Sequence, residues 1–132
     1  MDAPPPPLTD PSHRVAARVR DCAQVVYRTL GAGKPVDTYE KSLARIFHEQ
    51  QIKFAEQYPF GVPFYGPKDR GFYADFVVEG WVLLELKAVG RLTAAHVAQA
   101  TDYLRQSGAK LCLLINFGRS RLEIRTILPD LE

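Results

Sequence analysis

The amino-acid sequence predicts an α/β domain with a mixed central β-sheet and the element order ααβββαββ. Three observations lead to this fold class. Apolar residues recur every three or four positions between residues 13 and 51, which indicates two amphipathic helices. Two apolar runs flank Glu79-Gly80, a pattern typical of a β-hairpin. A further helical pattern separates this hairpin from the next apolar run, and such a connection allows parallel pairing of strands.

Bulk composition is that of one globular domain. The chain has 132 residues, of which 46% are hydrophobic, and a formal net charge of +2. We expect a Pro-rich flexible tail over residues 1–11 and a single domain over residues 12–132. No apolar run reaches the length of about 18 residues that a membrane span needs, so no membrane association is expected. Cys22 and Cys112 lie in apolar patterns and are expected as buried free thiols in a cytoplasmic protein.

The first helix is predicted from about His13 to Leu30, with Ser12 as its cap. Gly31 and Gly33 end it. Its core-facing stripe consists of Val15, Val19, Cys22, Val26 and Leu30.

A second helix is predicted to run to about Gln51. Asp37 followed by Glu40 is typical of a capping box at its start. Glu40 has a second interpretation, because it can also face a functional site from the first turn of this helix. The stripe on the buried side consists of Tyr39, Leu43, Ile46 and Phe47.

Three strands follow the second helix. The segment 52–65 is interrupted by two prolines, which places it at a sheet edge. The segments 72–78 and 81–88 form the hairpin. Side chains alternate along a strand, so Glu85 and Lys87 share a face. With the loop centred on Gly80, Asp75 lies across from Glu85 and shares its own face with Tyr73 and Val77.

The third helix is predicted between Thr93, its cap, and Gly108. Its apolar face carries Val97, Ala100 and Leu104, whereas His96, Gln99 and Tyr103 form a polar stripe. A solvated helix surface explains such a stripe as well as a functional site does. Residues 110–117 then read as a buried strand, and residues 121–126 as a final strand with alternating character.

The sequence gathers Asp75, Glu85 and Lys87 on one patch of an otherwise apolar sheet. Two facing carboxylates repel each other unless a cation lies between them. Mg²⁺ prefers oxygen ligands and often uses one or two carboxylates together with substrate phosphate. A nearby lysine can stabilise charge that develops on a phosphate oxygen. A surface ion pair that formed by chance is the alternative interpretation, worth less than about 1 kcal/mol.

The hairpin with Asp75 and Glu85-Leu-Lys87 resembles the core of the PD-(D/E)xK nuclease superfamily. Further segments resemble its small GxxExxR branch: Leu30-Gly-Ala-Gly33, Tyr39-Glu40, His96 to Leu104 and Leu113-Leu-Ile-Asn-Phe-Gly118. The resemblance runs from about Val15 to Phe117. It implies a restriction-endonuclease-like three-layer sandwich and a metal-dependent nuclease that hydrolyses phosphodiester bonds of nucleic acid.

The resemblance also implies roles for individual residues. Asp75, Glu85 and the carbonyl of Leu86 would hold Mg²⁺ or Mn²⁺, and Lys87 would position the attacking water or stabilise the phosphate. Gln99 would support Lys87 or the substrate phosphate, and Glu40 would supply a helical acid. The implied partner is nucleic acid, with DNA favoured over RNA, and a homodimer is an open alternative.

One departure from the family pattern supports a different function. Counted from Gly33, the family's glutamate position is Val36, whereas its tyrosine position is kept as Tyr39. The alternative is therefore a catalytically inactive nuclease-like domain that binds nucleic acid or a protein partner.

Overall fold

The computed structural model describes residues 11–60, 72–80 and 82–129, and the expected element order ααβββαββ is confirmed. The predicted tail lies almost wholly outside these residues. The elements are α1 (Pro11–Leu30), α2 (Val36–Glu49), β1 (Phe54–Phe60), β2 (Phe72–Val78), β3 (Val82–Lys87), α3 (Ala94–Ser107), β4 (Leu111–Asn116) and β5 (Glu123–Ile127). No helix in the described part of the chain is long and apolar enough to cross a membrane.

The five strands form one mixed sheet in the order β1-β2-β3-β4-β5. Strands β3 and β4 are parallel, and every other neighbouring pair is antiparallel. Helix α3 makes the crossover between the two parallel strands, as the sequence predicted. Strand β1, which contains Pro59, lies at an edge, where a missing ladder donor is tolerated.

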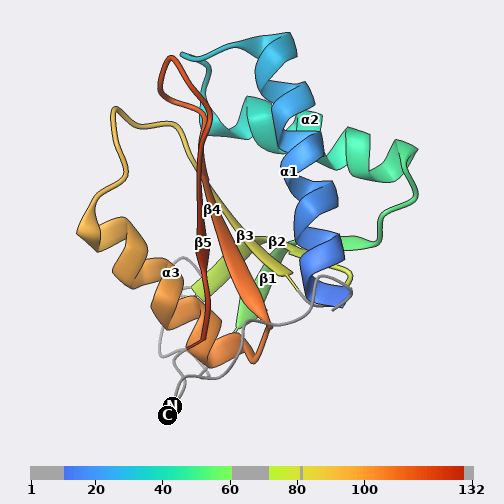
Figure 1. Cartoon of the computed structure of the whole chain (residues 1–132), viewed down its shortest axis with the longest axis vertical. Coiled ribbons are helices and arrows are strands. Elements are labelled where there is room, and N and C mark those ends of the chain that lie inside the picture. Colours follow the sequence, from blue (N-terminus) through green and yellow to red (C-terminus); the bar gives the residue numbers. More distant parts are fainter. Residues whose placement is uncertain (1–10, 61–71, 81, 130–132) are drawn as a thin grey trace.

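Helices cover both faces of this sheet, so the domain has three layers (Figure 1). Helices α1 and α2 pack on one face through an apolar cluster that includes Val19, Leu43 and Phe47. Helix α3 packs on the other face through a smaller cluster that includes Ala100 and Leu104. Both cysteines are buried and free, as expected.

The starts of the first two helices differ from the prediction. Helix α1 begins at Pro11, so Ser12 lies inside the helix, where it is buried, and is not the cap. Helix α2 begins at Val36 after an extended Pro35, and no side chain caps it. The predicted capping box of Asp37 and Glu40 is therefore wrong. Pro35 is fixed in an extended conformation, and its carbonyl already accepts the backbone N–H of Thr38 at 3.0 Å.

A buried asparagine fixes the loop that follows β3. The Asn116 side chain is fully buried, and its Oδ1 accepts the backbone N–H groups of Val89 and Gly118, each at 3.0 Å. Its Nδ2 donates to the Val89 carbonyl at 3.0 Å. These bonds tie the chain just beyond Lys87 to the end of β4. The backbone approach is so close that a Cβ on Gly118 would lie 2.3 Å from the Val89 carbonyl oxygen.

We predict that Gly118→Ala lowers the free energy of unfolding by about 1–3 kcal/mol, the usual cost of overpacking. The added methyl group collides with backbone atoms, which cannot swing away as a side chain could. Chemical denaturation at equilibrium measures the change. Gly90→Ala is the matched control, because a Cβ there meets no atom within 4 Å. Equal stability of the two variants would contradict the prediction.

Candidate active site

Asp75 and Glu85 meet across the β2–β3 hairpin. The register pairs Val78 with Val82 and Phe76 with Leu84, so Asp75 and Glu85 occupy the next rung. At this rung, side chains bond to the backbone of the opposite strand. Glu85 Oε2 accepts the backbone N–H of Asp75 at 3.0 Å, and Asp75 Oδ2 accepts the backbone N–H of Leu86 at 2.7 Å. The two carboxylates are thereby fixed beside each other.

In β1 and β2, the regular alternation of side chains between the two faces of the sheet is interrupted beside the Asp75–Glu85 rung. Ala74 and Val77 both belong to the α3-facing cluster although they are three residues apart, and Phe76 lies in the opposite cluster. The expectation that Asp75 continues a simple alternation from Tyr73 to Val77 is therefore wrong, because β2 changes phase around Asp75. On the neighbouring strand β1, Gln57 adopts a positive φ of 47° at this level, between the rungs Glu56–Phe76 and Tyr58–Ala74.

Gln57 connects the carboxylate of α2 to the hairpin. Its Nε2 donates to both oxygens of Glu40 at 3.3 Å and to Asp75 Oδ1 at 3.2 Å. Glu40 is therefore not a capping residue, and its carboxylate approaches the Asp75–Glu85 pair through this amide. Of the two interpretations that the sequence left open for Glu40, the contacts favour the one in which it faces the site.

Lys87 lies two residues beyond Glu85 and is paired with α3. Its Nζ donates to Gln99 Oε1 at 3.1 Å. The polar stripe of α3 does not act as one group, however. His96 forms a capping box with Thr93, and its Nδ1 accepts the Thr93 backbone N–H at 3.0 Å. Burial instead raises the pKa of the Tyr103 hydroxyl, and the nearby charges of Glu85 and Asp75 act in the same direction.

Burial makes negative charge costly at this site. Glu85 is only 5% exposed, and burial, followed by the charge of Asp75, raises its pKa to about 8. Burial also raises the pKa of Asp75, and the charge of Glu40 adds to this effect. Burial raises the pKa of Glu40 as well, with Glu56 acting in the same direction. Lys87 offsets part of the negative charge on Glu85 and Asp75.

The donor set fits a hard divalent cation that is completed by water and substrate. In the described ranges, no three His, Cys, Asp or Glu side chains are gathered so that they could hold a metal ion by themselves. Two adjacent carboxylates remain, Glu85 buried and Asp75 half-buried. Mg²⁺ commonly uses one or two such ligands and fills its other positions with water and phosphate oxygens. A cation there would also relieve the repulsion that raises the pKa of Glu85.

A cavity of about 370 Å³ lies beside Lys87. Lys34, Pro35 and Val36 line one side of it, and the chain from Leu86 to Val89 lines the other. Val36 is 41% exposed. The position at which the resembled family carries a glutamate therefore lies close to Lys87, but here it contributes an apolar side chain.

The sequence assigned no individual role to three contributors to the site, Gln57, Tyr103 and Asn116. Gln57 adopts a conformation that glycine or asparagine usually takes, and no motif includes it. Tyr103 stood out only as part of a helical stripe. Asn116 belonged to a segment used for the family resemblance, but its role as a clamp depends on Val89, which is remote in sequence. A sequence-based prediction of the register in which β1 pairs with β2 could have found Gln57, because this register places it opposite Asp75.

The raised pKa of Glu85 predicts how stability depends on pH in the metal-free protein. The carboxyl is protonated below its unfolded value of 4.5 and stays protonated in the fold up to about pH 8. Its contribution to the free energy of unfolding is fully present below about pH 4.5 and is lost as the pH rises from there through about 8, with a slope of at most about 1.4 kcal/mol per pH unit for one proton. We expect Glu85→Gln to be less sensitive to pH than the wild type in urea unfolding with EDTA.

Glu49→Gln serves as the control for this measurement, because Glu49 is exposed and lies at the end of α2. It should keep the wild-type pH profile. Parallel profiles for the wild type and Glu85→Gln between pH 5 and 9 would show that Glu85 keeps its ordinary pKa.

Comparisons with known proteins identify the family and the fold. The model of the PD-(D/E)XK nuclease superfamily matches residues 13–127. The crystal structure of SSO0001 is similar with a TM-score of 0.55 and 18% identity over 92% of this chain, which spans 62% of that protein. The crystal structure of an alkaline exonuclease from Laribacter hongkongensis has a TM-score of 0.49 and 16% identity to this chain. The match covers 87% of this chain and 71% of the exonuclease chain.

A search of curated protein sequences found no match. The likeness to SSO0001 shows the fold alone, and the sheet with helices on both faces is of the restriction-endonuclease-like type. The family match covers almost all of the described domain, including every residue of the site. This chain belongs to the PD-(D/E)XK nuclease superfamily.

Proposed function

We propose that this chain is a metal-dependent nuclease that hydrolyses phosphodiester bonds of nucleic acid. The adjacent carboxylates of Asp75, half-buried, and Glu85, buried, with Lys87 next along β3, are the observation that carries the proposal. Removing two adjacent carboxylates from most of their water is costly, and a structural ion pair would not need both of them. The arrangement is useful where a cation and a phosphate group are brought together.

Each residue of the site has a definite task in this proposal. Asp75, Glu85 and the Leu86 carbonyl hold the cation, and the Leu86 N–H keeps Asp75 oriented through the bond to Oδ2. Lys87 orients the attacking water or stabilises charge on the phosphate, and Gln99 keeps the ammonium group in place at 3.1 Å. Glu40 supplies a further acid, which Gln57 connects to Asp75.

Bound Mg²⁺ or Mn²⁺ would supply Lewis-acid polarisation of the phosphate and a more acidic water. DNA is favoured over RNA because of the resemblance to the GxxExxR branch, to which we assign the chain on Gly33, Tyr39 and the Leu-Leu-Ile-Asn-Phe-Gly segment. A cytoplasmic location is part of the proposal, supported by the free thiols of Cys22 and Cys112.

A catalytically inactive domain that binds nucleic acid or a protein partner is the second candidate. The position of Val36 beside Lys87 favours it, because an acid that the family pattern includes is replaced there by an apolar side chain. The two candidates differ in the behaviour of Val36→Glu. Cleavage that appears only in this variant would establish the second candidate, whereas cleavage by the wild type would exclude it.

We predict that Lys87→Ala and Lys87→Arg both fold normally and both lose about 10²–10³-fold in metal-dependent cleavage rate. Arginine keeps the charge, but its planar guanidinium cannot place a water as the compact ammonium group does. Cleavage of labelled DNA and RNA oligonucleotides with Mg²⁺ or Mn²⁺ measures the rate. Lys41→Ala is the control, since Lys41 is exposed on α2, and it should cut at the wild-type rate. Full activity of Lys87→Ala would show that the hairpin is not the active site.

We also predict that Mg²⁺ or Mn²⁺ raises the melting temperature of the wild type, because a ligand that binds only the folded state stabilises it. Asp75→Asn should abolish this increase, and Glu40→Gln should reduce it. Thermal melts at increasing metal concentration, together with calorimetric titration, measure both effects. Asp102→Asn on α3 is the control, because its carboxylate pairs with Arg105 at the surface. An unchanged response of Asp75→Asn would remove Asp75 from the metal site.

A further inference from the structure

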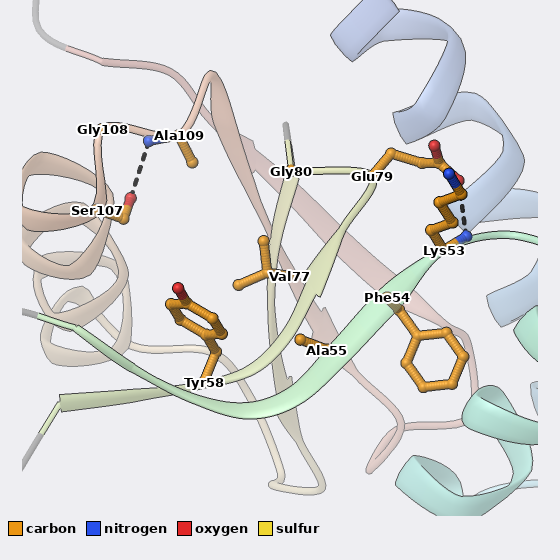
Figure 2. A pocket seen from close by; sticks show the side chains of 10 residues that line it. All are labelled: Lys53, Phe54, Ala55, Tyr58, Val77, Glu79, Gly80, Ser107, Gly108 and Ala109. Atoms are coloured by element: carbon orange, nitrogen blue, oxygen red, sulfur yellow. Dashed lines mark hydrogen bonds between the residues drawn. The ribbon is translucent and has the colours of Figure 1, made fainter.

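A second cavity, of about 610 Å³, lies between the edge of the sheet and the end of α3. Tyr58 and Val77 line it from β1 and β2, and Ser107 and Ala109 line it from the segment that joins α3 to β4. Figure 2 shows the Tyr58 ring and the Val77 side chain on the side of Ser107, while Phe54 points to the opposite side of the strands. The volume is in the usual range for sites that bind small organic groups.

Tyr58 provides an aromatic surface in this cavity. Its side chain is 45% exposed, which is unusual beside a core of buried aromatic rings. The phase shift at Gln57 explains the position of Tyr58. Ala55 and Tyr58 are three residues apart and would point to opposite faces of a regular strand, yet both line the same cavity. The positive φ of Gln57 therefore turns Tyr58 towards α3.

The charges in the cavity do not favour a phosphate group. Lys53 and Glu79 lie together at one end of it and contribute one charge of each sign. Glu79 Oε2 also accepts the backbone N–H of Lys53 at 2.7 Å, which keeps a carboxylate at this end. A neutral planar group with polar edges fits these surroundings better than an anion does.

Tyr58, which lines this cavity, lies next to Asp75 in the register of the sheet. Tyr58 follows Gln57, whose amide donates to Asp75 Oδ1 at 3.2 Å. Tyr58 also pairs with Ala74, the residue before Asp75. The aromatic surface of Tyr58 and the proposed catalytic carboxylate of Asp75 therefore lie one residue apart in the register of two neighbouring strands, a separation that neighbouring groups of one nucleotide chain can span.

We propose that the cavity is a subsite for an unpaired nucleobase, which stacks on Tyr58 while the neighbouring phosphate lies at Asp75, Glu85 and Lys87. The inference rests on the proposed nuclease function and makes it more specific. A base inside a duplex is already stacked and paired and cannot enter, so the substrate class is a single strand or a frayed end. Stacking on an aromatic side chain accepts any base, so the subsite selects for strandedness and not for sequence.

The test measures binding without catalysis, by fluorescence anisotropy of labelled oligonucleotides in EDTA. The probes are a single strand, the matching blunt duplex, and the single strand with abasic sites in place of its bases. The variants are Tyr58→Ala and Tyr58→Phe. Val25→Ala is the control, because it shortens an apolar side chain of α1 that is exposed to a similar extent, 40%, away from the cavity.

We expect the wild type to bind the single strand more tightly than the duplex or the abasic strand. Tyr58→Ala should weaken binding of the single strand about 5- to 100-fold and bind the abasic strand as the wild type does. Tyr58→Phe and Val25→Ala should keep wild-type affinity, the former because it keeps the ring. If Tyr58→Ala does not fold, Ala55→Leu is tested in its place. The larger side chain fills the cavity while Tyr58 stays intact, and it should weaken binding of the single strand to the same extent.

Two results would overturn the inference alone. One is wild-type affinity of Tyr58→Ala for the single strand. The other is an equal loss on the normal and the abasic strands, which would indicate a backbone contact. In either case the wild type would still cleave nucleic acid with Mg²⁺. A wild type that neither binds nor cleaves any of the probes would overturn the proposed function itself.

Discussion

The reciprocal bonds between Asp75 and the end of β3 are the interaction on which the rest of the site depends. The Asp75 carboxylate accepts the N–H of Leu86, and the Glu85 carboxylate accepts the N–H of Asp75. Side chains thus replace the backbone ladder at this rung, and both carboxylates are held by groups that cannot rotate away. A buried polar group that lacks a partner costs about 1–3 kcal/mol, so these bonds also make the burial tolerable.

The surrounding elements hold this rung from three directions. Gln57 on β1 donates to Oδ1 of Asp75, the oxygen that does not accept from Leu86, and it also donates to the Glu40 carboxylate on α2. Gln99 on α3 holds Lys87, and the Asn116 clamp fixes the loop after Lys87 against the end of β4. Burial, followed by the charge of Asp75, raises the pKa of Glu85, and a cation would be the natural counter-charge for the ionised pair.

Most of the fold could be predicted from the sequence because its signals are local. Apolar spacing identified the buried stripe of α1, and Thr93 and Gly108 correctly marked the ends of α3. The short turn at Gly80 fixed the hairpin register, which placed Asp75 opposite Glu85. The capping box at Asp37 was wrong because a short polar motif competes with the backbone that precedes it, and Pro35 decided where α2 begins.

The element order, the hairpin and the Asp-Glu-Lys grouping could be predicted before any coordinates, since each depends on residues close together in the chain. The parts that depend on pairing between distant segments became visible in the folded protein alone. The edge pairing of β1 with β2 brought Gln57 to Asp75, shifted the phase of both strands, and turned Tyr58 into a cavity under α3. Such effects leave no pattern in the local sequence, because the consequences of the conformation of one residue in β1 depend on the strand and the helix that pack beside it.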